Sequence, residues 1–411
     1  MSMFNIGTRN TGPLPPLVAP PSAVPVVGPS AEPAPAPSAE DQNQVRTQTP
    51  QGVDMGPLPW DAQAEAAQGP EAAFVNTPEY RQLSEPDQAT LKAFFETTIQ
   101  GKGAGKADEM AGRLAQLLTQ GKFASKDAFG QGLMDHLAAF NQAPLHESMS
   151  RTTSKDQVAR DMVMALADPA SLAQIPGSLN CAEATLEATL AYTQPADYAR
   201  IAVGLATHGE AKIPGPPHGP NPDSLKVGSS GPFGMMYASN NLSATIQRAF
   251  EARVDQRQGY WNWRDGERPA GLDADQVKML YDGIIGSDHL TMYANQGTDL
   301  MPAIKQALGH QNAVKVTMQS EEGLHSVAVT GISEKGVSIW DPATGKNETL
   351  SPAVFNSLIV RATLDSKHLD QETIRREQSS RRYTSYGEDG GYSENMRKEG
   401  GGRLGSRAQS G

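Results

Sequence analysis

Large apolar residues recur at helical spacing in four segments between residues 85 and 168. In each segment they stand three or four positions apart, so they would form one buried face of a helix. The four stripes are Leu91, Phe94, Phe95 and Ile99; Met110, Leu114, Leu117 and Leu118; Phe129, Leu133, Leu137 and Phe140; and Val158, Met162 and Leu166. They predict a helical region over residues 75–168. The pattern leaves open whether this region is a separate domain, a prodomain-like cap or the N-terminal lobe of a catalytic unit.

After residue 169 helices mix with short alternating strands, which predicts an α+β domain over residues 169–364. The predicted helices are Cys181–Tyr192, Tyr198–Ala206, Leu242–Arg253, Asp273–Ile284 and Leu300–Leu308, and the predicted strands are Val314–Met318, Leu324–Ile332 and Val337–Trp340. The Gly/Pro-rich segment Gly209–Gly234 is predicted to be a loop. A short element over Ser351–Leu364 closes the domain.

The two ends of the chain have the composition of disordered segments. Residues 1–74 are rich in Pro, Ala, Gly and Gln, and residues 365–411 are polar and then rich in Gly, Ser and Arg. Such sequences cannot bury enough apolar surface to offset the entropy lost when a backbone is ordered. We therefore expect a disordered N-terminal arm and a disordered C-terminal tail.

Charge and cysteine content exclude several classes of protein. The chain has 411 residues, a formal net charge of −11 and one cysteine. The acidic balance argues against nucleic-acid binding, and one cysteine cannot form an intramolecular disulfide. The sequence has no run of 18 apolar residues, so no membrane span is expected, and residues 1–11 do not resemble a Sec signal peptide. These features fit the cytoplasm, or secretion by a route independent of a signal peptide, and leave the oligomeric state open.

The single cysteine stands where a helix is predicted to begin. Cys181 follows Asn180, a favoured N-cap residue, and Glu183 would complete a capping box with Asn180. At the first helical position, unpaired backbone N–H groups and the helix dipole favour a thiolate over a thiol. The same N–H groups can stabilise an oxyanion. Cys181 is therefore the candidate nucleophile, with a buried structural thiol as the alternative.

A histidine and an aspartate lie on neighbouring predicted strands. His325 is near the start of the strand Leu324–Ile332, and Asp341 follows the next strand. They are an even number of residues apart, so a hairpin centred near Ser333 would place them opposite each other on one face of the sheet. We expect Asp341 to orient the imidazole and favour its protonated form, while the other ring nitrogen faces the Cys181 thiol. Four other histidines lie in predicted loops or at predicted helix ends, namely His208, His218, His289 and His310.

This order of residues resembles papain-like (clan CA) cysteine peptidases. In their C39-like branch, the pattern H-x-V-x-V-x-G is followed by D-P-x-x-G, and this chain has the first pattern at His325–Gly331 and the second at Asp341–Gly345. The resemblance covers about residues 170–364, and the papain motif Cys-Gly-Ser-Cys-Trp is absent. It implies a papain-like fold, in which a helical N-terminal lobe packs on a small antiparallel sheet. It also implies an oxyanion glutamine before the cysteine, for which Gln174 is the candidate and Asn180 the substitute.

The resulting hypothesis is a cysteine-dependent hydrolase of amide bonds, a peptidase or a deamidase, with the triad Cys181, His325 and Asp341. Its substrate would be a protein or peptide, and the mechanism requires no cofactor. No cysteine and histidine have the spacing of zinc ligands, so no metal site is expected. Trp261 and Trp263 are candidates for the substrate pocket. Two alternatives stay open: an acyltransferase or transglutaminase-type enzyme with the same triad, and a non-enzymatic interaction protein on a papain-like scaffold.

Overall fold

The computed structural model describes residues 69–175, 178, 180–217, 223–227, 241–258, 272–294, 299–321 and 323–377 of the chain. These residues belong to one structural unit that combines helices with β-sheet, so the predicted mixed class of helix and sheet is confirmed. Most of the predicted N-terminal arm and C-terminal tail lies outside the described residues.

Helices fill the described chain before residue 168. They are α1 (Ala72–Val75), α2 (Pro78–Arg81), α3 (Glu85–Ile99), α4 (Ala104–Thr119), α5 (Leu133–Gln142), α6 (Glu147–Ser150) and α7 (Lys155–Ala167). The predicted stripes form the inner faces of α3, α4, α5 and α7, with one exception. Phe129 precedes α5 and is 46% exposed, and its ring lies 5.1 Å from the Arg200 guanidinium. Its assignment to a helical stripe was therefore wrong.

A second group of helices follows, together with a small hairpin. These helices agree with prediction and are α8 (Cys181–Thr193), α9 (Pro195–His208), α10 (Asn241–Gln258) and α11 (Ala274–Ile285). The segment Gly209–Gly234, predicted to be a loop, contains strands β1 (Glu210–Ile213) and β2 (Asp223–Lys226), which pair in an antiparallel manner. Strands of four residues are too short to give a clear alternating signal among glycines and prolines.

The C-terminal part contains a six-stranded antiparallel sheet with the order β3-β8-β4-β5-β6-β7. Its strands are β3 (His289–Tyr293), β4 (Val314–Ser320), β5 (Gly323–Ser333), β6 (Gly336–Asp341), β7 (Lys346–Leu350) and β8 (Ile359–Asp365). β4, β5 and β6 were predicted. β3 and β7 were not, and His289 lies on the edge strand β3 instead of in a loop or at a helix end. The closing element Ser351–Leu364 consists of α13 (Pro352–Leu358) and most of β8.

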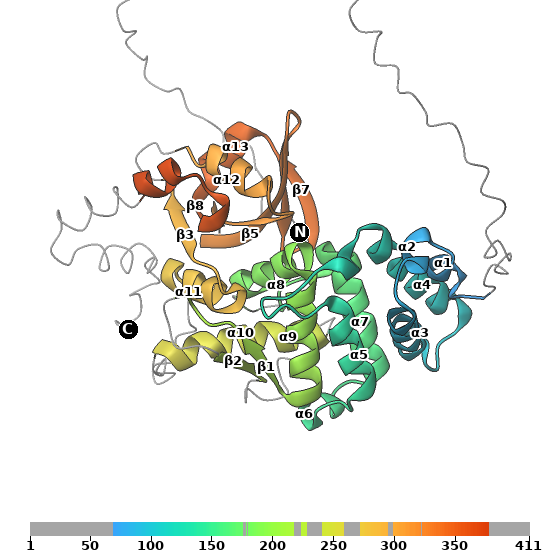
Figure 1. Ribbon diagram of the computed structural model, residues 1–411. Helices are drawn as coiled ribbons and strands as arrows, with labels where there is room; N and C mark the ends of the chain where they lie inside the picture. Colours follow the sequence, from blue (N-terminus) through green and yellow to red (C-terminus); the bar gives the residue numbers. More distant parts are fainter. Residues whose placement is uncertain are drawn as a thin grey trace, which may run out of the picture. The chain divides into compact units, whose positions relative to one another are not determined.

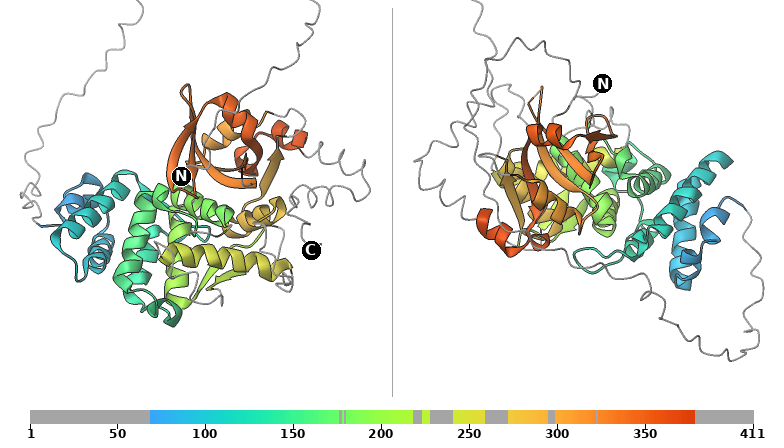
Figure 2. Two further views of the ribbon diagram at one scale, coloured as in Figure 1. Left: turned by 180° about the vertical axis from the view of Figure 1, so that it is seen from behind. Right: turned by 90° about the horizontal axis from the view of Figure 1, so that it is seen from above.

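The two faces of this sheet differ in character. One face carries apolar residues such as Val316, Val327 and Ile339, and it forms a core with α12 (Met301–Leu308) and α13. The opposite face carries polar residues, among them Lys315 and Thr317, and α8 packs against this face at β5. Figure 1 shows α12 and α13 on one side of the strands and α8 on the other, and the left view of Figure 2 shows this arrangement from behind.

The pairing of β5 with β6 contains a bulge. On the side of the turn Gly331 lies opposite Ser338, whereas the next pair along the ladder is Val329 with Ile339. β5 therefore has one more residue than β6 at this point, and the extra residue is Thr330. Such a bulge shifts, by one residue, the pairing of β5 with β6 from Val329 onward, on the side away from the turn.

The bulge corrects the predicted position of His325, which was expected directly opposite Asp341. In the observed register Ala328 lies opposite Trp340, so the position opposite Asp341 belongs to Val327 and His325 is a diagonal neighbour. Because residues two apart in a strand share a face, His325 and Asp341 still point to the same face. If the same residues of β5 and β6 had paired without a bulge, Ala328 would lie opposite Asp341, and His325 and Asp341 would have pointed to opposite faces.

The folded part extends beyond both predicted boundaries. Phe74, assigned to the disordered arm, is in α1, is fully buried and packs edge-to-face against two aromatic rings. At the other end residues 371–377 are helical, Leu369 is buried, and Ile374 packs on the core of the sheet. The predicted folded part, which began after residue 74 and ended before residue 365, was therefore too short at both ends.

One hydrophobic core joins the N-terminal helices to the helix that carries the cysteine. It includes Phe74 and Leu114 from the first region, Leu186 of α8, and Trp340 of β6. Lys122 also donates a hydrogen bond to the Ala191 carbonyl of α8 at 3.2 Å. The helical region and α8 therefore belong to one continuous packing arrangement.

Candidate active site

α8 begins at Cys181, as predicted, but its cap differs from the prediction. Asn180 occupies the N-cap position without a side-chain cap hydrogen bond, and its Nδ2 instead donates to Gln247 Oε1 at 2.6 Å. Glu183 is buried, with 3% of its surface exposed. The predicted capping box is therefore wrong, because the Asn180 side chain bonds to Gln247 in the interior and not to the helix terminus.

Cys181, His325 and Asp341 come together where the β5–β6 ladder ends. Nε2 of His325 lies 2.6 Å from Oδ1 of Asp341, and the imidazole also forms a hydrogen bond with the Cys181 thiol. The backbone N–H of Ser326 donates to Cys181 Sγ at 3.5 Å. Asp341 is fully buried and His325 nearly so, whereas Cys181 is partly exposed. One imidazole thus connects a buried carboxylate to the thiol of a partly exposed residue.

The charges in this group favour an ion pair between sulfur and imidazole. Burial by itself raises the pKa of the Cys181 thiol, but the hydrogen bond and charge of His325, the N–H of Ser326 and the charge of Lys315 outweigh it, so the pKa is lowered. Burial by itself lowers the pKa of His325, but its bonds to Asp341 and Cys181 raise it to about 9. These opposite shifts favour a thiolate beside an imidazolium near neutral pH.

Local backbone contacts hold the three groups in place. Thr185, one turn into α8, donates through Oγ1 to the Ser326 carbonyl at 3.2 Å and fixes the start of the helix against β5. After Asp341 the chain turns back, with Gly345 at φ 63° donating its N–H to the Asp341 carbonyl at 2.8 Å. The Asp341 carboxylate also accepts the N–H of Ala343 at 2.9 Å, which fixes its direction.

The two oxyanion candidates have different surroundings. The backbone N–H of Gln174 donates to the Pro342 carbonyl at 2.9 Å, next to the triad aspartate, and its Nε2 donates to the Ser178 carbonyl at 3.4 Å. Its Oε1 is buried without a hydrogen-bond partner among the described residues. Asn180 is held in the interior by Gln247. Of the two, Gln174 has its backbone N–H bonded to the turn that follows Asp341, while its side-chain amide donates to Ser178.

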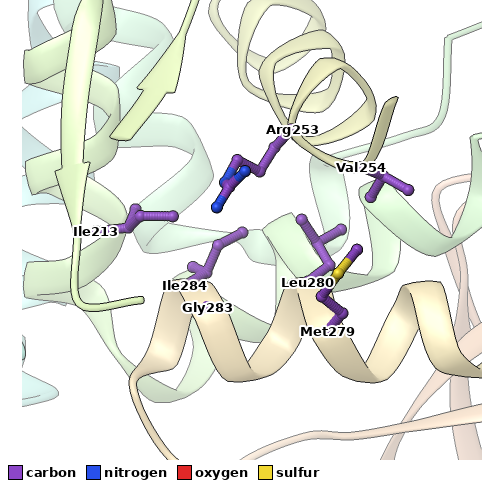
Figure 3. A pocket seen from close by; sticks show the side chains of 7 residues that line it. All are labelled: Ile213, Arg253, Val254, Met279, Leu280, Gly283 and Ile284. Atoms are coloured by element: carbon purple, nitrogen blue, oxygen red, sulfur yellow. The ribbon is translucent and has the colours of Figure 1, made fainter. Parts of the chain in front are cut away.

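The candidate pocket residues Trp261 and Trp263 lie outside the described residues, as does His218. A cavity among the described residues lies between β1, α10 and α11 (Figure 3), and no triad residue lines it. Arg253 points into this cavity and pairs with Asp223. The cavity holds about 10 Å³, roughly the room for one water molecule. It is therefore too small for a peptide.

Four buried charged residues on α8 and on the face of the sheet that α8 covers were missed in the sequence. Lys315 and Arg361 lie on the polar face of the sheet, and Glu183 and Glu187 lie on α8. Burial lowers the pKa of Lys315 to about 7, and burial raises the pKa of both glutamates to about 8. Polar residues alternate with apolar ones in the strand Val314–Met318. That signal was visible, but it equally fits a strand with one face in solvent.

Comparison with known proteins assigns no family to this chain. No protein-family model matches it, and no curated protein is significantly similar to it. Within the described residues, no cluster of His, Cys, Asp or Glu side chains could hold a metal ion. No helix of the described chain is long and apolar enough to cross a membrane. The function is therefore inferred from the geometry around Cys181.

Proposed function

We propose that this protein is a papain-like cysteine hydrolase that acts on amide bonds of a protein or peptide. The observation that carries the proposal is the hydrogen-bonded series from the buried Asp341 through His325 to the Cys181 thiol at the start of a helix. An imidazole that is oriented by a carboxylate and paired with a thiol is a common means of activating a cysteine nucleophile. The packing of α8 against an antiparallel sheet supports the papain-like assignment.

In the proposed reaction the Cys181 thiolate attacks the carbonyl carbon of the amide. Backbone N–H groups at the start of α8, together with the side-chain amide of Gln174, stabilise the negative charge on the carbonyl oxygen. The His325 imidazolium then gives its proton to the leaving amine, and a thioester remains on Cys181. Water, losing a proton to His325, hydrolyses the thioester and restores the thiolate.

The proposal is tested by incubating the full chain with a complex mixture of peptides and analysing the products by mass spectrometry. Wild-type protein should produce new peptide termini or deamidated residues, and Cys181→Ala should produce neither. Cys181→Ser is the matched control, because it retains a side chain of similar size with a far weaker nucleophile. Products that persist in Cys181→Ala would contradict the proposal, as would the absence of any product from the wild type.

A primary amine added to the same mixture separates hydrolysis from acyl transfer. A hydrolase should give the same free acids whether or not the amine is present. Incorporation of the amine at the expense of the acid would assign the triad to an acyltransferase or transglutaminase-type reaction.

A further inference from the structure

A row of polar side chains crosses the sheet from the nucleophile to the edge strand. The register places Ser326 of β5 opposite Thr317 of β4, Thr317 opposite Arg361 of β8, and Arg361 opposite Tyr293 of β3. Residues directly opposite each other share a face. The row starts at Ser326, whose N–H contacts the Cys181 sulfur, and ends at Tyr293, which is partly exposed at the edge of the sheet.

Two buried cations on this face share one neutral acceptor. Lys315 Nζ donates to Thr317 Oγ1 at 2.8 Å, and Arg361 Nε donates to the same oxygen at 3.3 Å. Lys315 is 1% exposed and Arg361 is 3% exposed. Among the described residues, neither cation forms an ion pair with a carboxylate. Burying two like charges around one hydroxyl is unfavourable unless an anion compensates them.

The surrounding carboxylates do not supply that anion. Asp273 and Asp275, at the start of α11, act on Arg361 only through their charge, and the Asp273 carboxylate caps α11 by accepting the Gln276 N–H at 2.8 Å. Glu183 acts on the Lys315 charge, but burial raises its pKa to about 8, so it is mostly protonated at neutral pH. Burial lowers the pKa of Lys315 to about 7, so this lysine is only partly protonated near neutral pH, and the charge of Cys181 acts on both side chains. A bound carboxylate would favour the protonated form of Lys315 beside the charged Arg361.

We propose that Lys315 and Arg361 form an anion subsite that holds a carboxylate of the substrate beside the carbonyl attacked by Cys181. This inference rests on the proposed function and narrows its substrates to peptides with a carboxylate close to the reacting amide. The carboxylate comes from an acidic side chain or from a free chain end. A guanidinium and an ammonium arranged around one hydroxyl present several donors to such a group.

The position of the subsite relative to the sulfur supports this assignment. Thr317, which accepts from both cations, is paired with Ser326, and the Ser326 N–H contacts the Cys181 sulfur, so a carboxylate bound between the cations would lie near the reacting atom. Tyr293, at the end of the row on the edge strand, is partly exposed. The subsite thus combines charge, donors and proximity to the nucleophile.

Alkylation of Cys181 by two small reagents tests the subsite without knowledge of the substrate. Iodoacetate carries a carboxylate, and iodoacetamide carries a neutral amide of nearly the same size. In both reactions the thiolate sulfur forms a bond to the CH₂ carbon and iodide leaves with the electrons of the C–I bond. The chain has one cysteine, so all label reports on Cys181. The ratio of the two rate constants measures anion preference, because the thiolate fraction cancels.

The folded full chain should prefer iodoacetate, relative to iodoacetamide, more strongly than the same chain unfolded in urea. Lys315→Met and Arg361→Gln should each lower this ratio about tenfold through loss of a charge-assisted hydrogen bond. Lys335→Met, in the exposed turn of the hairpin, removes the same charge and should leave the ratio unchanged. A ratio equal in the folded and unfolded chains, or unaltered in both subsite variants, would overturn the subsite.

Should Cys181 react with neither reagent, the proposed function fails and ligand binding decides the subsite alone. N-acetylglutamate α-amide carries a side-chain carboxylate, N-acetylalanine a chain-end carboxylate, and N-acetylglutamine α-amide is the neutral match. At least one carboxylate should raise the Tm of wild type and of Cys181→Ala but not that of Lys315→Met, and the effective one identifies the source. In that case, a Tm unchanged by both carboxylates would overturn the subsite.

Discussion

The Asp341 carboxylate is fully buried and is fixed by contacts on both sides. Its Oδ1 lies 2.6 Å from His325 Nε2 and accepts the N–H of Ala343 at 2.9 Å. The raised pKa of His325 depends on this carboxylate, and the lowered pKa of the Cys181 thiol depends in turn on His325. A change at Asp341 should therefore be felt at the sulfur, which Asp341 does not contact directly.

Asp341→Asn should keep the fold but slow alkylation of Cys181 by roughly ten- to a hundredfold at pH 7, since the imidazolium loses its carboxylate partner. The pKa of His325 should fall from about 9, and the pKa of the thiol should rise. The measurement is the alkylation rate across a pH series, and Glu334→Gln, in the exposed turn of the same hairpin, is the matched control. An unchanged rate profile in Asp341→Asn would show that the carboxylate does not orient the histidine.

Glu187 is a second buried carboxyl group with consequences for pH. It is in the centre of α8, where Oε2 accepts hydrogen bonds from Ser243 at 2.6 Å and from Gln247 at 2.8 Å. Burial raises its pKa to about 8. The folded state thus keeps a proton that the unfolded state releases above its ordinary pKa of about 4.3. The free energy of unfolding contributed by this group therefore falls as the pH rises from about 4.3 to about 8.

Glu187→Gln should remove this dependence, because glutamine stays neutral and retains an acceptor for Ser243 and Gln247. The wild type should lose about 1.4 kcal/mol more than the variant for each pH unit between about 5 and about 7.5. Urea unfolding at a series of pH values measures the difference, which also cancels the titration of other groups. Parallel stability curves for the two proteins would show that Glu187 is ionised in the folded state.

Residue chemistry was partly predictable from the sequence, and the limits have physical causes. Cys181 stood out because it is the single cysteine and lies at a helix start, and His325 and Asp341 stood out beside apolar strands. Lys315 did not, because alternation within one strand cannot show whether its polar face meets water or another helix. The burial of Glu183 could not be predicted either, because the elements that cover it are distant in sequence.

At the level of elements, the bulge in β5 determines whether the histidine and the aspartate can meet. Thr330 is the extra residue, and it shifts the pairing so that His325 and Asp341 share a face. The predicted face was right for the wrong reason, because the predicted register placed the two residues directly opposite each other. A bulge at a threonine has no clear local signature, whereas a bulge at a glycine with positive φ would have one.

Deletion of Thr330 should be tolerated, because Val329 and Gly331 would then continue the ladder without an unpaired residue. The side chains beyond Val329 toward His325 keep their pairing partners, so the thiol pKa should stay low. Deletion of Ala328 is the matched control, since it shifts His325 by one position and turns it to the other face. Alkylation rates against pH, with circular dichroism to verify folding, distinguish the two. A thiol pKa that returns to an ordinary value in the Thr330 deletion would contradict the register argument.

Helices were more predictable than strands because the apolar stripes of long helices extend over several turns. α3, α4 and α7 match their stripes, and α8 begins at the predicted residue. β1, β2 and β3 are four or five residues long and lie next to glycines, prolines or helices. Their pairing partners, which stabilise them, are not visible in a short window of sequence.

For the whole molecule, the residues of the hydrophobic cores define how much of the chain is needed for stable folding. Phe74 is fully buried in one core, and Leu369 and Ile374 pack on the other. The composition of the chain assigned these three residues to the disordered ends, because a single apolar residue hardly changes the composition of a segment rich in alanine or in charged residues. Only the contacts of the folded chain show that these residues are part of it.

A fragment of residues 69–377 should unfold cooperatively with a Tm within a few degrees of that of the full chain. A fragment of residues 76–365 should be less stable by at least about 3–5 kcal/mol, the usual cost of removing a buried phenylalanine. Urea unfolding of the three proteins measures both differences. Equal stability of the two fragments would show that Phe74 and the C-terminal helical residues do not contribute to the cores.

The central claim is that Cys181 is an activated nucleophile, and the pH dependence of its alkylation tests this most directly. Iodoacetamide labelling of the full chain reports on this one thiol. The rate should rise with a midpoint well below the free-cysteine pKa of about 8.5. It should then stay level until His325 loses its proton near pH 9. His325→Ala should move the midpoint upward. A midpoint at or above about 8.5 in the folded wild type, unchanged in His325→Ala, would contradict the account.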